Sequence, residues 1–108
     1  VRKCGAKRVF FASASPPVRF QNVYGIDMPA TKELVAHDRS IKEIQKYIGA
    51  DELIYQSLKD LKRSAHAGNP EIDKFEDSVF SGNYCTGDIS QKYLESLENS
   101  RDDSKRIG

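Results

Sequence analysis

The residues with the clearest capacity for chemistry lie where a short apolar run, residues 23–26, meets Asp27-Met28-Pro29. Ligands bind at the carboxyl ends of strands in open α/β sheets, so an acid at such a junction is a candidate binding group. The same carboxylate can instead cap a helix that begins near Pro29, by accepting hydrogen bonds from free N–H groups. The residues alone leave both roles of Asp27 open, and capping is the commoner one.

Other reactive side chains form no recognisable site. His37 and His66 have no cysteine neighbours, and Cys4 and Cys85 show neither a C-x-x-C pair nor the spacing of metal ligands. Residues 102–104, Asp-Asp-Ser, match the opening of a phosphate-binding loop, but they lack the apolar strand and the glycine-rich continuation of that motif. We therefore expect no catalytic residue and no metal ligand in this sequence.

Composition narrows the class of protein. The 108 residues are 38% hydrophobic and 31% charged, with no run long enough to span a membrane. Residues 1–30 carry five basic residues and one acidic residue, yet the basic residues are not interleaved with aromatics as in nucleic-acid-binding surfaces. Two isolated thiols suit a reducing cytoplasm. We expect one cytoplasmic domain without a nucleic-acid or membrane partner.

Residues 1–30 are expected to hold two strands. A helical turn ending at Gly5 precedes the first strand, residues 9–14, whose continuous apolar character predicts cover on both faces. Prolines at 16 and 17 end that strand, and residues 23–26 form the second. Because the chain opens in the last turn of a helix, we expect it to be a piece of something longer.

Residues 31–68 are expected to hold helices with one short strand. A first helix follows Pro29, and Ser40 and Glu43 form a capping box before a helix that ends at Gly49. Residues 53–55 form the strand, and Ser57 opens the next helix.

Residues 69–100 are expected to hold a loop and a C-terminal helix. Asn69 is a candidate cap for a helical turn starting at Pro70, and residues 75–88 suggest a loop or small hairpin. Asp88 is expected to open the last helix, and residues 101–108 form a polar tail.

Several short motifs together resemble a known enzyme family. They are Ser15-Pro16, the stretch NVYGIDMP at residues 22–29, IGAD at 48–51, FSGNY at 80–84, and Thr86. Over essentially the whole chain the pattern resembles the C-terminal part of amidophosphoribosyltransferase. The resemblance implies an α/β fold, namely the C-terminal portion of a type I phosphoribosyltransferase-like domain with short strands followed by several helices.

The resemblance also implies a reaction. Such enzymes release ammonia from glutamine in an N-terminal glutaminase domain. A phosphoribosyltransferase domain with magnesium then uses the ammonia to displace pyrophosphate from phosphoribosyl pyrophosphate, giving 5-phosphoribosylamine for purine biosynthesis. The glutaminase cysteine, the magnesium ligands and the phosphoribosyl pyrophosphate loop would all lie upstream, so this segment alone is expected to be inactive. The implied partners are the glutaminase domain, purine nucleotides and further copies in a homo-oligomer. A stand-alone interaction or regulatory module is the alternative.

By the same resemblance, Asp27, Met28 and Pro29 lie on the side of the substrate or of a nucleotide effector. Leu34 lines the ammonia passage, and Arg101 pairs with the glutaminase domain. Core packing for Leu34 and a surface ion pair for Arg101 are comparable alternatives.

Some members of this family hold an iron–sulfur cluster through cysteines. The corresponding positions in this sequence are Asn22, Asp73 and Glu76, and neither Cys4 nor Cys85 matches one of them. Since such a cluster requires thiolates, we predict no cluster, as in the cluster-free bacterial type.

Overall fold

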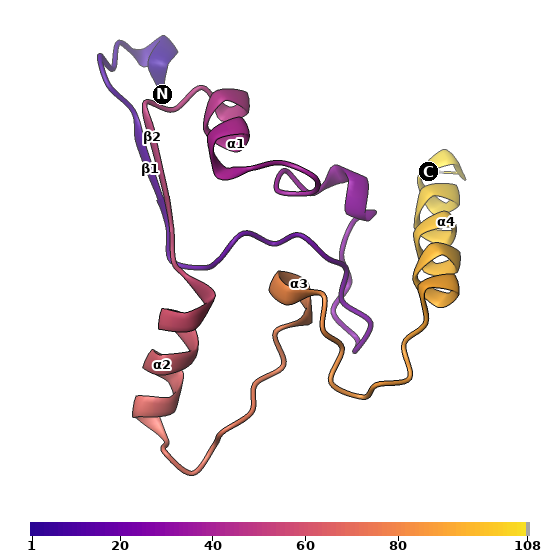
Figure 1. Ribbon diagram of the computed structural model, residues 1–108. Coiled ribbons are helices and arrows are strands. Elements are labelled where there is room, and N and C mark those ends of the chain that lie inside the picture. The colour runs from indigo at the N-terminus through magenta and orange to yellow at the C-terminus, as the bar shows by residue number, and fades with distance from the viewer. Residues whose placement is uncertain (108) are drawn as a thin grey trace. The chain divides into compact units, whose positions relative to one another are not determined.

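The computed structural model describes the backbone of residues 1–107 and the side chains of residues 1–101. The chain forms two compact units, one made of Val1–Pro17 and Asp38–Phe75, the other of Val18–His37 and the residues from Glu76 onward. Each unit is described by itself below (Figure 1). In the described part, no helix is long and apolar enough to cross a membrane.

The first unit is built on a pair of parallel strands, β1 (Phe10–Ser13) and β2 (Glu52–Tyr55), which lie side by side in Figure 1. Phe10 aligns with Glu52 at one end of the pair and Ser13 with Tyr55 at the other. A 3-10 turn, Arg2–Cys4, precedes β1 and ends at Gly5 with a left-handed φ of 98°. The strands predicted at residues 9–14 and 53–55 and the glycine that ends the first turn are confirmed.

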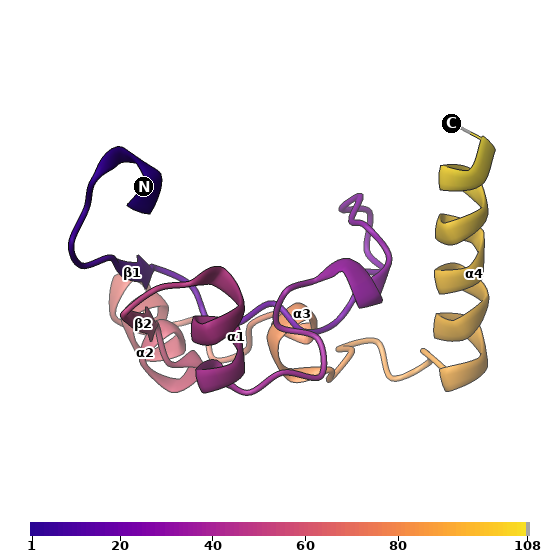
Figure 2. The same cartoon turned by 90° about the horizontal axis from the view of Figure 1, so that it is seen from above.

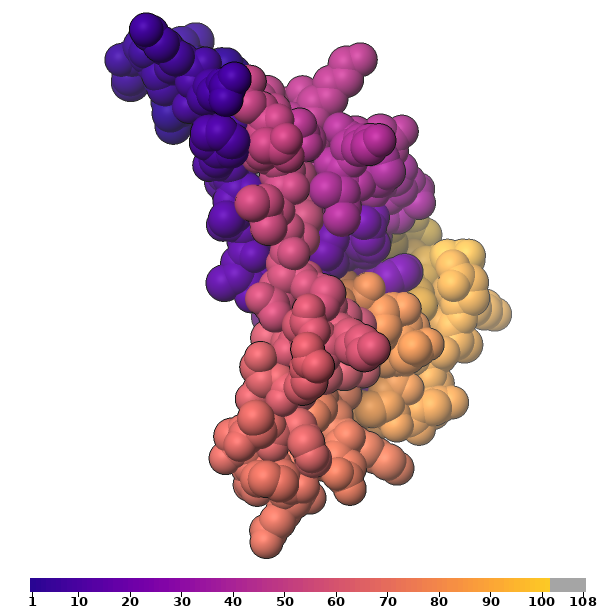
Figure 3. All heavy atoms as spheres, turned by 60° about the vertical axis from the view of Figure 1, so that its left-hand side comes forward, coloured from indigo at the N-terminus to yellow at the C-terminus, as the bar shows by residue number. Residues whose placement is uncertain are grey.

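The predicted cover on both faces of β1 is wrong for the described residues. Phe10 and Phe11 are 62% and 54% exposed, and Ile54 on β2 is 59% exposed. Figure 3 shows the strand pair open at the surface. In the described residues, helix α1 (Ile41–Ile48) packs against β2 and buries Ile44 and Leu53, whereas Phe10, Phe11 and Ile54 remain outside this small apolar core.

The helix boundaries of the first unit follow the predicted caps. Ser40 Oγ accepts from the Glu43 N–H at 3.2 Å, and the Glu43 carboxylate accepts from the Ser40 N–H at 2.6 Å, so the capping box is complete. The hydrogen bond from the Ser40 backbone N–H to the carboxylate, and then the interaction of the carboxylate with the Ser40 side chain, hold the pKa of Glu43 below its ordinary value. Gly49 ends α1 in a left-handed conformation with a φ of 71°. Ser57 caps α2 (Leu58–Gly68) in the predicted way.

The predicted helical turn after Pro70 is wrong. Asn69 instead ends α2, its N–H bonded to the carbonyls of Ala65 and His66. Its side-chain oxygen accepts from the Glu71 N–H at 3.2 Å, so it stabilises a turn rather than a new helix.

The predicted second strand, residues 23–26, is also wrong. Asn22 Oδ1 accepts hydrogen bonds from the N–H groups of Tyr24 (2.8 Å) and Ile26 (3.1 Å). This side chain takes two donors that a ladder would need, and Gly25 adopts a φ of 106°. The segment is therefore a tight loop, and it belongs to the second unit.

Two short helical elements and one long helix complete the second unit. A 3-10 turn, Thr31–Glu33, stands where a longer helix after Pro29 was predicted, and α3 (Ser78–Ser81) lies inside the predicted loop or hairpin. The long helix α4 (Gln91–Ile107) is beside residues 20–33 in both views (Figure 2).

The ends of α4 differ from the prediction. Its first turn is capped by Ser90, whose Oγ accepts from the Tyr93 N–H at 3.2 Å, and not by Asp88. Its backbone continues to Ile107 through the predicted polar tail. The side chains of residues 102–104, excluded above as a phosphate-binding loop, lie outside the described residues.

Candidate functional site

The motif residues of the second unit meet around Tyr24. The rings of Tyr24 and Tyr84 pack edge to face, with centroids 6.3 Å apart. Tyr24 Oη lies 3.0 Å from Thr86 Oγ1, and Tyr84 Oη donates to the Gln21 carbonyl at 2.8 Å. Burial raises the pKa of Tyr84, which therefore remains a neutral donor. The structure thus joins two motifs that are about 60 residues apart in the sequence.

A pocket of about 270 Å³ lies between this loop and α4. It brings together Asp27 and Arg101, two of the predicted site residues. Asp27 is exposed and makes no hydrogen bond or ion pair with any residue that the structure describes. Its carboxylate is therefore available to an external donor. The lining residues are Asn22, Val23, Gly25, Ile26, Asp27, Tyr93, Leu97 and Arg101.

Arg101 forms the polar wall of the pocket. Its Nη1 donates to Gln21 Oε1 at 3.0 Å and its Nη2 to the Asn22 carbonyl at 3.2 Å. Gln21 and Asn22 are only 5% and 3% exposed, so the guanidinium binds the start of the loop in a part-buried place. These contacts lie within the unit, and the predicted pairing of Arg101 with another domain stays a prediction.

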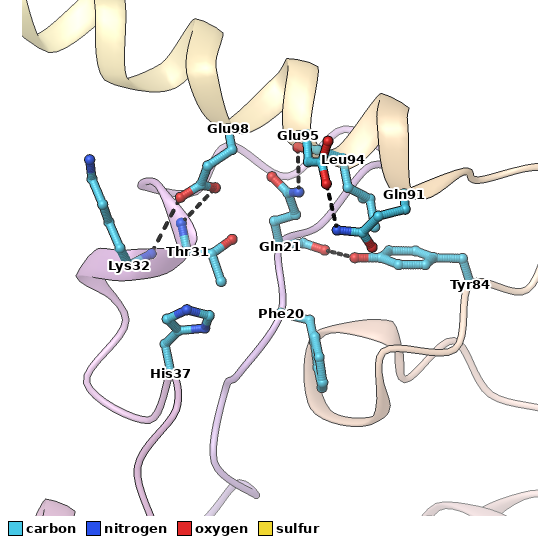
Figure 4. Close-up of a pocket in the computed structure, with 10 residues that line it drawn as sticks. All are labelled: Phe20, Gln21, Thr31, Lys32, His37, Tyr84, Gln91, Leu94, Glu95 and Glu98. Carbon is cyan, nitrogen blue, oxygen red and sulfur yellow. Dashed lines mark hydrogen bonds between the residues drawn. The ribbon is translucent and has the colours of Figure 1, made fainter.

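The capping role considered for Asp27 is wrong, because Glu98 takes it. The two carboxylate oxygens of Glu98 accept from the N–H groups of Thr31 (2.8 Å) and Lys32 (3.3 Å), as Figure 4 shows. Ala30 occupies the N-cap position and has no side-chain acceptor. Sequence reasoning missed Glu98, since a residue 67 positions away leaves no local capping pattern.

Three further predicted residues lie outside this pocket. Met28 and Leu34 are half-buried, Pro29 is exposed, and Leu34 ends the Thr31–Glu33 turn with extended backbone. Their proposed roles remain predictions. A second hollow of about 310 Å³ (Figure 4) is lined by Phe20, Gln21, Thr31, Lys32, His37, Tyr84, Gln91, Leu94, Glu95 and Glu98.

Nothing in the described part groups three or more metal-binding side chains. At two of the positions that correspond to cluster ligands, Asn22 and Glu76, the side chains accept hydrogen bonds from backbone N–H groups. Asn22 shapes the loop, and Glu76 Oε1 accepts from the Ser78 N–H at 2.9 Å. Cys4 and Cys85 are both exposed and free.

Comparison with known proteins gives a consistent result, although no protein-family model matches the chain. The chain is 53% identical over 107 residues to amidophosphoribosyltransferase of Escherichia coli, covering 98% of the chain and 21% of that enzyme. Identity to the enzymes named amidophosphoribosyltransferase is 50% over 105 residues in Pseudomonas aeruginosa and 44% over 101 residues in Saccharomyces cerevisiae. These matches cover 97% and 94% of the chain, and 21% and 19% of the relatives. The chain spans about one fifth of the length of these relatives. By its sequence, the chain is homologous to the C-terminal part of amidophosphoribosyltransferase.

Proposed function

We propose that the chain serves as the C-terminal part of a phosphoribosyltransferase domain that makes 5-phosphoribosylamine from phosphoribosyl pyrophosphate and glutamine. The observation that carries the proposal is the 53% identity over 98% of the chain. The geometry supports it, because the motifs around Tyr24 and Tyr84 pack into one loop scaffold instead of standing apart.

The remaining machinery would come from other parts of the parent enzyme. Ammonia would be supplied by a glutaminase domain of the same chain, and magnesium would be held by residues outside this segment. The segment would contribute no catalytic residue and hold no iron–sulfur cluster. The parent enzyme would work in the cytoplasm as a homo-oligomer.

The pocket at Asp27 would receive a purine nucleotide effector. Its carboxylate, which has no partner among the described residues, is suited to accept hydrogen bonds from ribose hydroxyls, the role that acidic side chains fulfil in many nucleotide sites. Met28 and Pro29 would shape the same side of the loop.

Leu34 and Arg101 would connect this domain to the glutaminase domain. A half-buried apolar side chain such as Leu34 can line a passage that keeps ammonia away from water. Arg101 already orients the loop through Gln21 and Asn22, so it would link the loop to any acidic partner on the other domain.

A chimera tests the proposal directly. The corresponding C-terminal segment of the Escherichia coli enzyme is replaced by residues 1–108, and formation of phosphoribosylamine is measured with glutamine as the nitrogen donor. We expect activity within about tenfold of the parent enzyme, because half of the positions in the segment are identical. An enzyme truncated before the segment is the inactive control. A folded, oligomeric chimera without activity would refute the proposal.

A further inference from the structure

Helix α4 binds the segment before and after the loop through one of its faces. Leu94, Glu98 and Arg101 are spaced four and three residues apart, which places them along one side of a helix. The Leu94 carbonyl accepts from Gln21 Nε2 at 3.0 Å. Leu97, on the same side, is half-buried. The apolar contact face of α4 therefore also carries polar groups that bind specific backbone positions.

These polar contacts hold both ends of the loop that carries Asp27. Arg101 binds its beginning, at Gln21 and the Asn22 carbonyl, and Glu98 binds the backbone after its end, at Thr31. Three residues of helix rise about 4.5 Å, so both attachments lie within one turn of α4. Both ends of the loop are thus bound to adjacent positions on one helix.

Of the two contacts, the one made by Glu98 is the better candidate for fixing the position of the loop. Thr31 and Lys32 offer backbone N–H groups at the start of a helical turn, and such groups need acceptors. Ala30, fully buried at the N-cap, has no side-chain acceptor for them. A carboxylate that accepts two N–H groups forms charge-assisted hydrogen bonds, which are about twice as strong as neutral ones.

We propose that Glu98 is a positioning residue: by binding the N–H groups of Thr31 and Lys32 it fixes the segment from Asp27 to Leu34 against α4. The inference rests on the proposed function, since that segment carries the proposed effector and ammonia-passage residues. Weakening these hydrogen bonds should change the use of glutamine-derived ammonia and the inhibition by the effector. The rate of the transfer reaction with free ammonia should not change.

The experiment uses the full-length chimera defined above. Glu98→Gln keeps the size of the side chain but removes its charge and one acceptor, and Glu98→Asp keeps the charge with a shorter reach. Asp88→Asn is the matched control, since it also removes one carboxylate charge near α4. Asp88 is exposed and has no hydrogen bond with a described residue.

Three quantities are measured: the rate with glutamine, the rate with free ammonia, and inhibition by purine ribonucleotides. For Glu98→Gln we expect the glutamine-to-ammonia rate ratio to fall about tenfold and the inhibitor concentration for half inhibition to rise by a similar factor. The ammonia-supported rate should stay within about twofold of the chimera. Glu98→Asp should give a smaller change of the same sign, and Asp88→Asn none.

The outcomes separate the inference from the function beneath it. If the unsubstituted chimera folds but is inactive with both nitrogen donors, the proposed function fails. If Glu98→Gln lowers only the melting temperature and leaves the ratio and the inhibition unchanged, Glu98 is structural and the inference is wrong. If Glu98→Gln does not fold, Glu98→Asp decides in the same way, and loss of folding in both variants also overturns the inference.

Discussion

Asp27→Asn distinguishes a binding carboxylate from a structural one. Asp27 is exposed, and Glu98 already occupies the capping position that Asp27 was considered for. Removing its charge should therefore leave the free energy of unfolding within about 0.5 kcal/mol of the unsubstituted protein. If Asp27→Asn weakens inhibition without lowering the free energy of unfolding, the loss must come from contacts with the bound nucleotide.

The size of that effect follows from hydrogen-bond energies. A hydrogen bond to a charged oxygen contributes about 1.5–3 kcal/mol, compared with about 0.5–1.5 kcal/mol for a neutral one. Asparagine retains one acceptor oxygen without the charge. The binding free energy from each hydrogen bond between a ribose hydroxyl and residue 27 should therefore fall by about 1–1.5 kcal/mol. This corresponds to inhibition weakened about 5- to 13-fold for each hydroxyl.

The assay compares inhibition of the full-length chimera by purine ribonucleotides and by their 2′-deoxy forms. The loss in Asp27→Asn should be smaller for the deoxy inhibitors, because they offer one donor fewer. Asp88→Asn serves again as the control. Unchanged inhibition by ribonucleotides in a folded Asp27→Asn enzyme would refute the assignment of Asp27 to the effector site.

Two further predictions concern stability. A hydrogen bond from the Val9 N–H (2.7 Å) holds the pKa of Asp51 below its ordinary value of 3.8, so the unfolded state binds the proton more readily. Its stabilising contribution is full above about pH 5 and is lost as the pH falls through the folded-state pKa. Amide exchange at Val9, corrected for its intrinsic rate, should be faster in Asp51→Asn at neutral pH, and unchanged protection would contradict this. Gly82→Ala should lower the free energy of unfolding by about 2–3 kcal/mol, because φ is +77° and a Cβ would lie 3.0 Å from Phe20 Cζ. Gly49→Ala, with φ +71° and no neighbour within 4 Å, should cost only about 1–2 kcal/mol in denaturant unfolding, and equal losses would show that the Phe20 contact is irrelevant.

Local signals predicted both ends of α1 and the start of α2. The capping box of Ser40 and Glu43, the cap at Ser57 and the left-handed Gly49 each depend on atoms within about four residues of one another. Such information is present in a short window of sequence. The same window misled at residues 23–26, where β-branched and aromatic residues favour a strand but the Asn22 side chain takes the backbone donors.

The candidate site was predicted less completely, for a physical reason. Asp27 was predicted from its position after an apolar run and Arg101 from the resemblance, and the structure places both in one pocket. Glu98 escaped notice, because its hydrogen bonds to Thr31 and Lys32 join positions far apart in sequence. A glutamate in an amphipathic helix normally lies on the side that faces solvent. Composition and periodicity therefore cannot reveal that Glu98 binds two backbone N–H groups.

The apolar side chains of β1 and β2 are exposed, although the sequence predicts a strand that is covered on both faces. Phe10, Phe11 and Ile54 are all more than half exposed, although their strands pair in the predicted way. An apolar surface of this kind is a normal marker of a contact with another protein surface or domain. The relatives are about five times longer than this chain. The continuous apolar run of β1 predicts cover on both faces, and we expect other parts of the proposed parent enzyme to supply that cover.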